Sequence, residues 1–419
     1  MEQEKSTVLK LVYITLLGVT FYICRYLFIY EVGLPIYSLG VFGFVILGLY
    51  ITDNMEFIRY KSSNKGYVII FLLNFIAFFI WFIDDAWDFG LIPFFLIFTA
   101  SQVFISTIIS IVTFKIKNLT TYGTGEMKNR IVESLSNFPE YKYIDEAGRK
   151  GSLTDFIKEK NIRILIITKL KLTKEEIREI LNLKLSGVEV KSYSDYMLEN
   201  EAKIDVEFID EEWLLQAYGF KILHSHIQTN IKRIFDMTMA FIIGILTLPI
   251  MGIAAIIVKL ESPGPIIYSQ DRVGENGKEF KVHKFRSMRN DAEKDGAKWA
   301  QKNDPRVTKF GNIMRKTRID ELPQLINVIK GEMSFIGPRP ERMVFIKELE
   351  KQIPYYNLRH MVKPGLTGWA QVMYPYGASV EDARRKLEYD LYYIKQHSLY
   401  LDLVIMILTF KTVVFGKGR

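Results

Sequence analysis

Two adjacent carboxylates and an arginine held between prolines are the residues of this chain best suited to chemistry. Asp320 and Glu321 lie just before a proline, and the motif GPRP at 337–340 contains Arg339. Proline is tolerated in the first turn of a helix, so a helix is predicted to begin near Asp320 and to end at Gly331. The positive end of that helix favours ionised carboxylates and accepts phosphate. A carboxylate nucleophile, a cation ligand and an anion-binding arginine within one short span indicate phosphoryl-group chemistry.

Basic side chains recur among glycines and aromatic residues on the N-terminal side of this pair. Scattered arginines usually form a solvated surface, but beside a carboxylate pair they suit a diphosphate and a lipid phosphate. We therefore expect a substrate-binding set made of Arg339, Lys284, Arg286, Arg318, Arg272 and Arg315.

Long uncharged stretches show that these residues belong to a membrane protein. Residues 11–24, 32–52, 66–83 and 89–114 each approach or exceed the roughly 20 residues that cross a bilayer. Lysines and arginines gather before the first run and after the second and fourth, whereas the opposite loops carry only acidic residues, so both ends are predicted to be cytoplasmic. No cleavage site follows the first run. The net charge of +8 is attributed to contacts with anionic lipid and phosphate, and no nucleic-acid partner is expected.

A fifth apolar run, residues 237–258, is predicted to enter the membrane without crossing it. Basic residues flank it on both sides, which is the cytoplasmic pattern. Pro249 removes one backbone hydrogen bond, and the Thr247 hydroxyl is expected to satisfy a carbonyl freed by the proline. The alternative is an ordinary fifth span. The last segment, 399–415, contains Asp402 and Lys411 and is predicted to be an interfacial helix.

Between the membrane runs the chain alternates strands and helices. Residues 163–168 and 187–190 are predicted to be strands, and residues 173–183 a helix with a capping box. Gly123 and Gly125 hint at a dinucleotide loop, but Lys128 occupies the third glycine position. We expect a small Rossmann-like domain that binds no dinucleotide.

Several motifs, in this order, resemble those of the bacterial sugar transferase family of monotopic phosphoglycosyl transferases. The resemblance extends from about residue 231 to the C-terminus, and the preceding part is similar to the large polyprenyl-phosphate hexose-1-phosphate transferase branch. One departure is Leu248 before Pro249, where relatives often carry serine. The motifs are KRIFD at 232–236, KFRSM at 284–288, the pair at 320–321, GPRP at 337–340 and KPGLTGWAQV at 363–372.

The resemblance implies a mixed membrane protein of three parts. Residues 1–118 would form a four-helix transmembrane bundle, and residues 119–222 a Rossmann-like α/β domain that is not catalytic. Residues 223–419 would form an α-rich monotopic catalytic domain, with a re-entrant helix over about 234–260. The expected location is the bacterial inner membrane, with the catalytic domain on the cytoplasmic face.

The resemblance also implies a reaction. Asp320 would attack a UDP-sugar, expel UMP and carry the sugar phosphate, which undecaprenyl phosphate then takes. Glu321 would help to hold Mg²⁺. This would be the first membrane step of exopolysaccharide, capsule or O-antigen synthesis. The sugar cannot be read from the sequence, and a homodimer is reasonable.

Two other functions are compatible with parts of the sequence. A membrane-anchored nucleotide-sugar dehydratase also joins four spans to a Rossmann unit, but it needs an intact glycine fingerprint and a large Rossmann domain. A non-catalytic scaffold that binds polyprenyl phosphate would show no dependence on Asp320.

Overall fold

The chain divides into two compact units, Met1–Lys191 and Ser192–Arg419, which are described separately. The computed structural model describes residues 2–28, 91–113, 116–146, 151–209, 225–289, 304–374, 377 and 379–414, together with residues 42, 43, 45, 46, 70, 74, 78, 220, 222 and 292.

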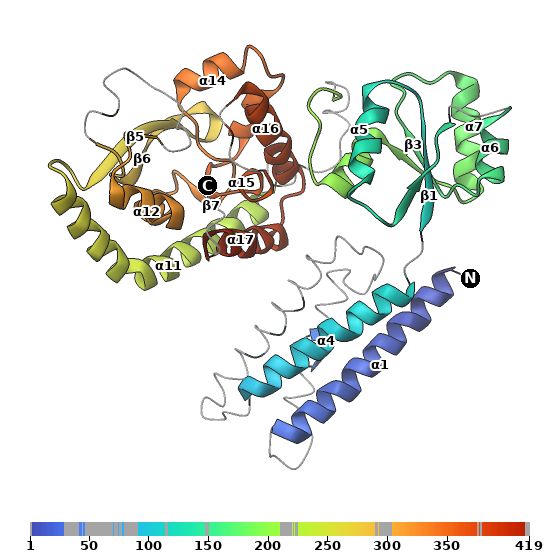
Figure 1. Cartoon of the computed structure of the whole chain (residues 1–419), viewed down its shortest axis with the longest axis horizontal. Coiled ribbons are helices and arrows are strands. Elements are labelled where there is room, and N and C mark those ends of the chain that lie inside the picture. The colour runs from blue at the N-terminus through green and yellow to red at the C-terminus, as the bar shows by residue number, and fades with distance from the viewer. Residues whose placement is uncertain are drawn as a thin grey trace. The chain divides into compact units, whose positions relative to one another are not determined.

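The first unit begins with apolar helices. Helices α1 (Glu2–Phe28) and α4 (Leu91–Thr113) contain the first and fourth apolar runs and pack against each other (Figure 1). Val45 and Ile70, from the second and third runs, belong to the same buried cluster as residues of α1 and α4. Most of the second and third runs lies outside the described residues.

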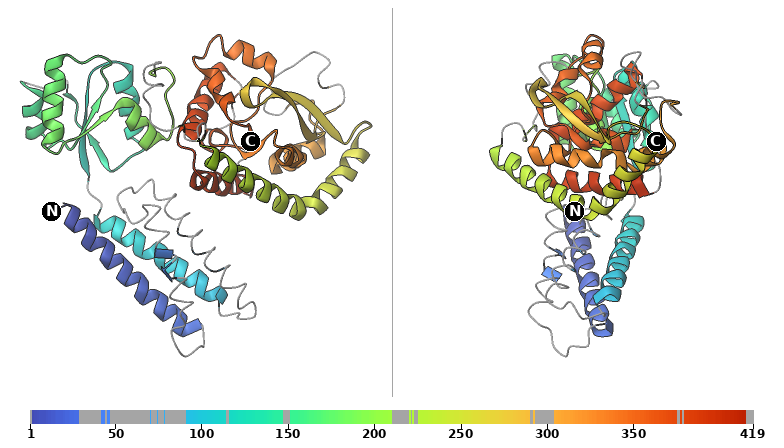
Figure 2. Two further views of the ribbon diagram at one scale, coloured as in Figure 1. Left: turned by 180° about the vertical axis from the view of Figure 1, so that it is seen from behind. Right: turned by 90° about the vertical axis from the view of Figure 1, so that its left-hand side faces the viewer.

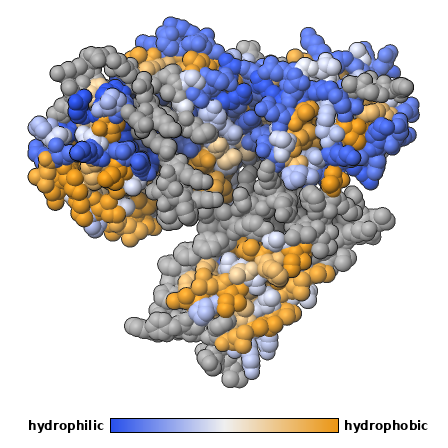
Figure 3. All heavy atoms as spheres, viewed as in Figure 1, coloured by the Kyte–Doolittle hydropathy of each residue, from blue (hydrophilic) through white to orange (hydrophobic). Residues whose placement is uncertain are grey.

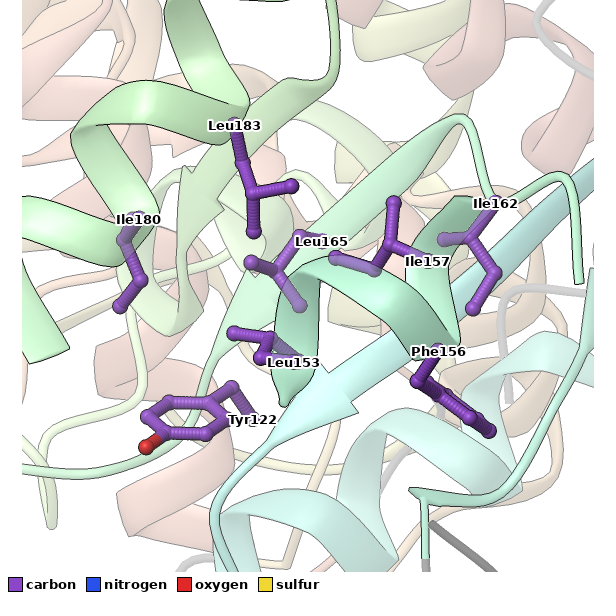
Figure 4. Close-up of a cluster of buried hydrophobic side chains, with 8 residues drawn as sticks. All are labelled: Tyr122, Leu153, Phe156, Ile157, Ile162, Leu165, Ile180 and Leu183. Carbon is purple, nitrogen blue, oxygen red and sulfur yellow. The ribbon is translucent and has the colours of Figure 1, made fainter. Parts of the chain in front are cut away.

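A four-stranded sheet follows, with strand order β2-β1-β3-β4. Strand β1 pairs in parallel with β2 and with β3. Helices α6 and α7 pack a buried cluster against one side of this sheet (Figure 4), and α5 lies on the other side (Figure 1). The predicted strands and helix are confirmed, including the capping box of Thr173 and Glu176. The elements are β1 (Lys117–Tyr122), α5 (Glu126–Leu135), β2 (Tyr141–Tyr143), α6 (Leu153–Glu159), β3 (Ile164–Ile167), α7 (Lys174–Leu185) and β4 (Glu189–Ser192).

The glycine loop after β1 is closed by the chain itself. The backbone N–H of Gly123 donates to Glu146 Oε1 at 2.8 Å. A Cβ atom at Gly123 would lie 2.8 Å from Thr168 Oγ1, so the glycine is required by close packing. In a dinucleotide site such backbone N–H groups face phosphate. The carboxylate of Glu146 takes that place and would repel phosphate.

The second unit is rich in helices and contains two small sheets, the antiparallel pair β5–β6 and the parallel pair β7–β8. Its elements are α8 (Tyr193–Tyr196), the π-helix η2 (Met197–Glu201), α11 (His226–Glu261), β5 (Ile267–Val273), η3 (Glu275–Gly277), β6 (Glu279–Phe285), α12 (Lys309–Thr317), η4 (Ile319–Gln324), α13 (Leu325–Lys330), β7 (Ser334–Ile336), α14 (Met343–Leu349), η5 (Tyr356–Met361), β8 (Gly365–Thr367), α15 (Trp369–Met373), α16 (Val380–Lys395) and α17 (Leu399–Val414).

Helix α11 is long, apolar and mostly exposed. It has 36 residues, and only 11% of its most apolar stretch is buried. The surface over it is hydrophobic (Figure 3), and its ribbon is bent (Figure 2). Among the described residues, α4 and α11 are the two helices long and apolar enough to cross a membrane, judged by length and composition alone. An exposed apolar surface of this size marks a membrane or partner contact.

Pro249 lies inside α11, but Thr247 does not have the expected partner. Its hydroxyl donates to Ile243 O at 2.7 Å. The carbonyl that loses its N–H partner to Pro249 is that of Ile245, four residues earlier. Thr247 therefore reinforces the turn before the break and does not satisfy the freed carbonyl.

A buried ionic cluster joins the start of α11 to α17. Lys232 Nζ lies 2.8 Å from Asp236 Oδ1 and 3.0 Å from Asp402 Oδ2, and all three residues are buried. Ser334 donates to Asp236 at 2.7 Å, and the Tyr393 hydroxyl donates to Asp402 at 2.8 Å. The first turns of α17 therefore pack inside the unit, which corrects the expectation of a wholly interfacial helix.

Candidate active site

The carboxylate pair lies on a tight turn between two helices. After α12 ends at Thr317, Arg318 adopts a left-handed conformation (φ 58°), and η4 follows. Helix α13 continues from η4 and ends at Gly331, which is also left-handed (φ 85°). The predicted helix from near Asp320 to Gly331 is confirmed, with its first turn wound as a 3₁₀ helix that contains Pro323.

Three cations surround one oxygen of Glu321. Arg339 Nη2 lies 2.7 Å from Glu321 Oε1, Lys284 Nζ lies 3.2 Å from it, and Arg318 Nη1 lies 3.5 Å from it. Glu321 is buried, so these charges act in a medium of low dielectric constant, where they are stronger than in water. Glu321 thus organises three of the six basic residues predicted from the sequence.

The neighbouring carboxylate is arranged differently. Asp320 is also buried, yet its Oδ1 atom has no hydrogen-bond partner among the described residues. A buried polar atom without a partner costs free energy in the folded state. Its presence here indicates an atom kept for a ligand.

These surroundings separate the two carboxylates electrostatically. Burial raises the pKa of Asp320, and the negative charge of Glu321 adds to that rise. Burial acts in the same direction on Glu321, but Arg339, Lys284 and Arg318 outweigh it and hold the pKa of Glu321 well below its usual value. Burial also lowers the pKa of the Lys284 ammonium to about 8. Glu321 is therefore ionised, and Asp320 is the carboxyl group whose charge is less well compensated.

The loop that carries Arg339 is fixed by a second motif through backbone contacts. The N–H of Gly337 donates to Thr367 O at 2.9 Å, and the N–H of Gly365 donates to Pro338 O at 2.8 Å. A Cβ atom at Gly365 would lie 2.1 Å from Gly337 N, so only glycine fits. This explains the motif KPGLTGWAQV, whose glycines let β8 approach the loop closely enough to orient Arg339.

Side chains that the sequence interpretation missed also hold Arg339. Arg359 Nη2 donates to Arg339 O at 3.0 Å and to Asp390 Oδ2 at 2.8 Å. Arg339 Nη1 donates to Gln371 Oε1 at 3.2 Å, while Gln371 Nε2 is buried without a hydrogen-bond partner among the described residues. Gln371 lies within a motif already noted, whereas the Arg359–Asp390 pair joins distant elements and leaves no local pattern.

Two further predicted residues support the site from its edge. Arg315 Nε donates to Ser287 Oγ at 2.9 Å, and its charge acts on Asp320. Arg272 Nη1 lies 2.9 Å from Glu341 Oε1 and donates to Pro340 O at 3.1 Å, so it braces the loop of Arg339. Neither has a direct hydrogen bond to the carboxylate pair in the described contacts.

Arg286 has a different role from the expected one. Its Nη2 atom donates to Val258 O at 3.2 Å and to Ser262 O at 2.6 Å, and its Nη1 atom donates to Pro263 O at 3.0 Å. These carbonyls belong to the last turn of α11 and the residues just after it. A positively charged group is favourable at a helix C-terminus. We therefore assign Arg286 to capping α11 and no longer count it as a substrate ligand.

The carboxylate pair supplies fewer protein ligands than a metal site built from protein alone. No group of three or more His, Cys, Asp or Glu residues that could hold a metal ion occurs in the described part of the chain. Mg²⁺ usually binds one or two carboxylates, substrate phosphates and several waters. The free Oδ1 of Asp320 and the carboxylate of Glu321 fit that pattern, with the remaining ligands left to phosphate and water.

Comparison with known proteins identifies a family for the C-terminal part of the chain. A family model described as Bacterial sugar transferase matches residues 227–416. The chain is 40% identical over 198 residues to the exopolysaccharide production protein PSS of Rhizobium leguminosarum bv. phaseoli, which covers 45% of this chain and 98% of that protein. This chain belongs to the bacterial sugar transferase family.

Other members of the family carry names that state an activity. The chain is 48% identical over 197 residues to the UDP-N-acetylgalactosamine-undecaprenyl-phosphate N-acetylgalactosaminephosphotransferase of Aeromonas hydrophila, covering 47% of each chain. It is 44% identical over 187 residues to the UDP-glucose:undecaprenyl-phosphate glucose-1-phosphate transferase of Escherichia coli K12, covering 44% of this chain and 40% of that protein. The matched region thus spans less than half the length of these two relatives.

The family region contains the whole candidate site. Asp320, Glu321 and their three cations lie inside residues 227–416. So do α11, the buried cluster around Lys232 and the residues that hold Arg339. The site and its supports therefore belong to the part of the chain that the family shares.

Proposed function

We propose that this chain transfers a sugar-1-phosphate from a UDP-sugar to undecaprenyl phosphate, giving undecaprenyl-diphosphate-sugar and UMP. The observation that carries the proposal is the pair of unlike carboxylates. Asp320 has a free, buried oxygen, and Glu321 beside it gathers Arg339, Lys284 and Arg318. The names of the relatives supply the substrate class. The product begins the synthesis of an exopolysaccharide, capsule or O-antigen.

The first step is attack by Asp320 on the sugar-bearing phosphorus of the donor. A bond forms between a carboxylate oxygen and phosphorus, the bond to the bridging oxygen breaks, and UMP leaves with that oxygen. Phosphoryl transfer depends on positioning and charge neutralisation. Arg339 and Lys284 contact Glu321. When the donor binds, its negative diphosphate attracts the same two side chains and orients on them.

The second step regenerates the enzyme. A phosphate oxygen of undecaprenyl phosphate attacks the same phosphorus, and the bond to Asp320 breaks. The carboxylate of Asp320 returns, and the sugar phosphate leaves on the lipid. Splitting one transfer into two displacements is the usual advantage of covalent catalysis.

Mg²⁺ is proposed as the cofactor, held by Glu321 with Asp320 adjacent. When bound, such a cation neutralises phosphate charge. The three protein cations around Glu321 then orient the donor.

The acceptor lipid is proposed to reach the site along α11. This helix exposes a continuous apolar surface, and its last turn is capped by Arg286, the residue that directly follows β6. Cytoplasmic-type charges flank it on both sides, which favours a helix that enters and leaves one leaflet. We propose that the protein lies in the bacterial inner membrane, with a four-span N-terminal bundle and the catalytic unit on the cytoplasmic face.

The function is tested by UMP release from a panel of UDP-sugars that includes UDP-glucose and UDP-N-acetylgalactosamine. The full chain is held in nanodiscs, with and without undecaprenyl phosphate and Mg²⁺. Wild type is expected to release UMP from one or two donors. Asp320→Asn is expected to lose at least about a thousandfold in turnover, because the nucleophile is removed.

An exposed carboxylate of the same unit provides the control. Asp271→Asn removes a negative charge on β5 and is expected to keep wild-type turnover. UMP release retained in Asp320→Asn would remove Asp320 from the nucleophile role. No release from any donor by wild type would favour a scaffold that binds polyprenyl phosphate.

A nucleotide-sugar dehydratase is less well supported. That activity requires a dinucleotide in the Rossmann-like domain. The N–H of Gly123 is already bonded to Glu146, whose carboxylate would repel a pyrophosphate. A dehydratase would also leave the paired carboxylates of the second unit without a role.

A further inference from the structure

A stretch of irregular chain is built into the second unit. Residues 201–209, which we call the docking segment, begin at the last residue of η2 and form no regular helix or strand beyond Glu201. Connecting chain normally runs over the surface. Here Ala202, Ile204 and Val206 expose 6% or less, and Asp205 exposes only 3%. The docking segment is therefore part of the core of this unit.

Specific hydrogen bonds fix the docking segment on α16. The N–H of Ile204 donates to Glu388 O at 3.0 Å. The hydroxyl of Tyr193 donates to Asp205 Oδ2 at 2.6 Å, and Glu207 pairs with Arg384. Ala202 adopts a left-handed conformation (φ 51°), which is unfavourable for a residue other than glycine. Such a conformation persists only where the surroundings impose it.

That conformation turns the carbonyl of Ala202 toward Trp369. Trp369 Nε1 donates to Ala202 O at 2.9 Å. The indole exposes 1% of its surface and stacks on Tyr392 with ring centroids 5.9 Å apart. A buried indole N–H needs an acceptor. The docking segment supplies it.

Trp369 is the first residue of α15, and this helix leads directly to the active site. Two residues later, Gln371 Oε1 accepts from Arg339 Nη1 at 3.2 Å, and Arg339 Nη2 contacts Glu321 at 2.7 Å. Helix α15 has only five residues, and a helix this short has little stability of its own. Its position therefore depends on what holds its ends.

We propose that the docking segment is a positioning element of the transferase site. It holds Trp369, and through α15 it sets Gln371 and Arg339 in the geometry that Glu321 requires. Ala202 and Trp369 are positioning residues and touch no substrate. The proposal rests on the proposed transferase function for its kinetic consequence, but the coupling between the docking segment and α15 is a property of the fold.

The kinetic test is a double-mutant cycle on the full chain in nanodiscs. Trp369→Phe keeps an aromatic ring and loses the N–H donor, and Gln371→Ala removes the contact with Arg339. Each single variant is expected to lower kcat for UMP release, Trp369→Phe by about fivefold to tenfold, the effect of one lost hydrogen bond. Because Trp369 acts through Gln371, the double variant is expected to match Gln371→Ala alone.

Ser379→Ala is the matched control for lost stability. Ser379 caps α16 through its bond to the N–H of Asp382 and has no described contact with the docking segment. Removing it is expected to destabilise the unit by about the same amount as Trp369→Phe, with kcat unchanged. Additive kinetic effects of Trp369→Phe and Gln371→Ala, or an equal fall of kcat in Ser379→Ala, would overturn the proposal.

Hydrogen exchange tests the coupling without the reaction. The N–H groups of Gln371 and Val372 both bond to Gly368 O. Trp369→Phe is expected to speed exchange in peptides covering α15 and in those covering residues 201–206, both by a similar factor. Exchange that rises in only one of the two would overturn the proposal. If wild type released no UMP, the transferase function would fail, and exchange alone would decide the coupling.

Discussion

Three positive groups converge on a single oxygen of Glu321, and this arrangement assigns different tasks to two neighbouring carboxylates. Glu321 is permanently charged, so it can hold Arg339, Lys284 and Arg318 in place while the donor is absent. Asp320 lacks such partners and keeps an open oxygen. At this scale, the proposed nucleophile differs from its neighbour in having a carboxylate oxygen without a hydrogen-bond partner among the described residues.

The ammonium of Lys284 gives this site a testable pH dependence. Its pKa is lowered to about 8, so it is charged below pH 8 and neutral above it. If its charge binds the diphosphate, kcat/KM for UMP release should fall about tenfold per pH unit above about 8. Lys284→Arg is expected to move this alkaline limb to higher pH, because a guanidinium stays charged.

Lys281, on the same strand, serves as the comparison. Its side chain is exposed, so Lys281→Arg should leave the pH profile unchanged. An alkaline limb that stays in place in Lys284→Arg would show that another group titrates there.

The sequence predicts single residues well where their chemistry is local. Asp320, Glu321 and Arg339 were identified by adjacency and by flanking prolines, and the structure brings them together. Arg286 was misassigned, because an arginine in a basic stretch looks the same whether it meets phosphate or the end of a helix. Only the fold shows which carbonyls lie within its reach.

At the scale of elements, the position of Arg339 depends on a close approach between β7 and β8. A side chain at the glycines between them would prevent that approach. Gly337, Gly365 and Gly368 each leave less than about 3 Å for a Cβ atom beside the facing backbone. Each strand has only three residues, so the close packing at these glycines holds the two strands in position.

Gly365→Ala is therefore expected to displace the loop of Arg339. The new Cβ would lie 2.1 Å from Gly337 N and 2.4 Å from Thr367 O, where backbone atoms cannot yield. Turnover should fall by more than about tenfold, with a loss of stability of a few kcal/mol, as for other overpacked sites. UMP release and thermal unfolding measure the two effects.

Gly252→Ala gives a matched substitution within α11. A Cβ atom at Gly252 meets nothing within 4 Å. Alanine favours a helix over glycine by up to about 1 kcal/mol, so this variant should be as stable as wild type or more so. Equal behaviour of the two variants would contradict the role given to Gly365.

Element types were predicted better than their packing. The helix at the carboxylate pair, the strands of the parallel sheet and the proline-bent helix all follow from local propensity and periodicity. The hydroxyl of Thr247 bonds a different carbonyl from the one predicted, and the start of α17 is buried. In the first case the hydroxyl had a choice of carbonyls, and in the second the helix had a choice between the protein interior and the interface. The periodicity of the sequence does not show which of these the fold selects.

At the scale of the molecule, Lys232 ties the apolar helix α11 to the rest of the second unit. Its ammonium neutralises Asp236 on the same helix and Asp402 on α17. Breaking a buried ion pair by removing one partner leaves uncompensated charge, which costs about 3–5 kcal/mol. Lys232→Met is therefore expected to lower the thermal stability of the full chain markedly.

Lys259, near the other end of α11, is the control for this prediction. Among the described residues, its ammonium donates to the carbonyl of Gly264 at 3.3 Å, and its side chain is exposed. Lys259→Met should change the free energy of unfolding by less than about 0.5 kcal/mol. Wild-type melting of Lys232→Met would show that the cluster does not hold the two helices together.

Only part of the domain organisation of the chain could be predicted from its sequence. The apolar runs and the motifs locate a membrane part and a family region. Residues 201–209 fall within the range 119–222 predicted for the Rossmann-like domain, yet most of them are buried in the second unit. An irregular segment is buried because of the residues that pack around it in the folded protein. Its own sequence therefore contains no periodic pattern that predicts its burial.

The open oxygen of Asp320 has a consequence for the durability of the enzyme. Burial raises the pKa of Asp320, so the folded state gains most from this group when it is protonated and loses that gain as the pH rises through the raised pKa. The ionised form of Asp320, which the proposed attack requires, therefore works against folding. Selection for a faster transferase and selection for a more heat-resistant one pull this position in opposite directions.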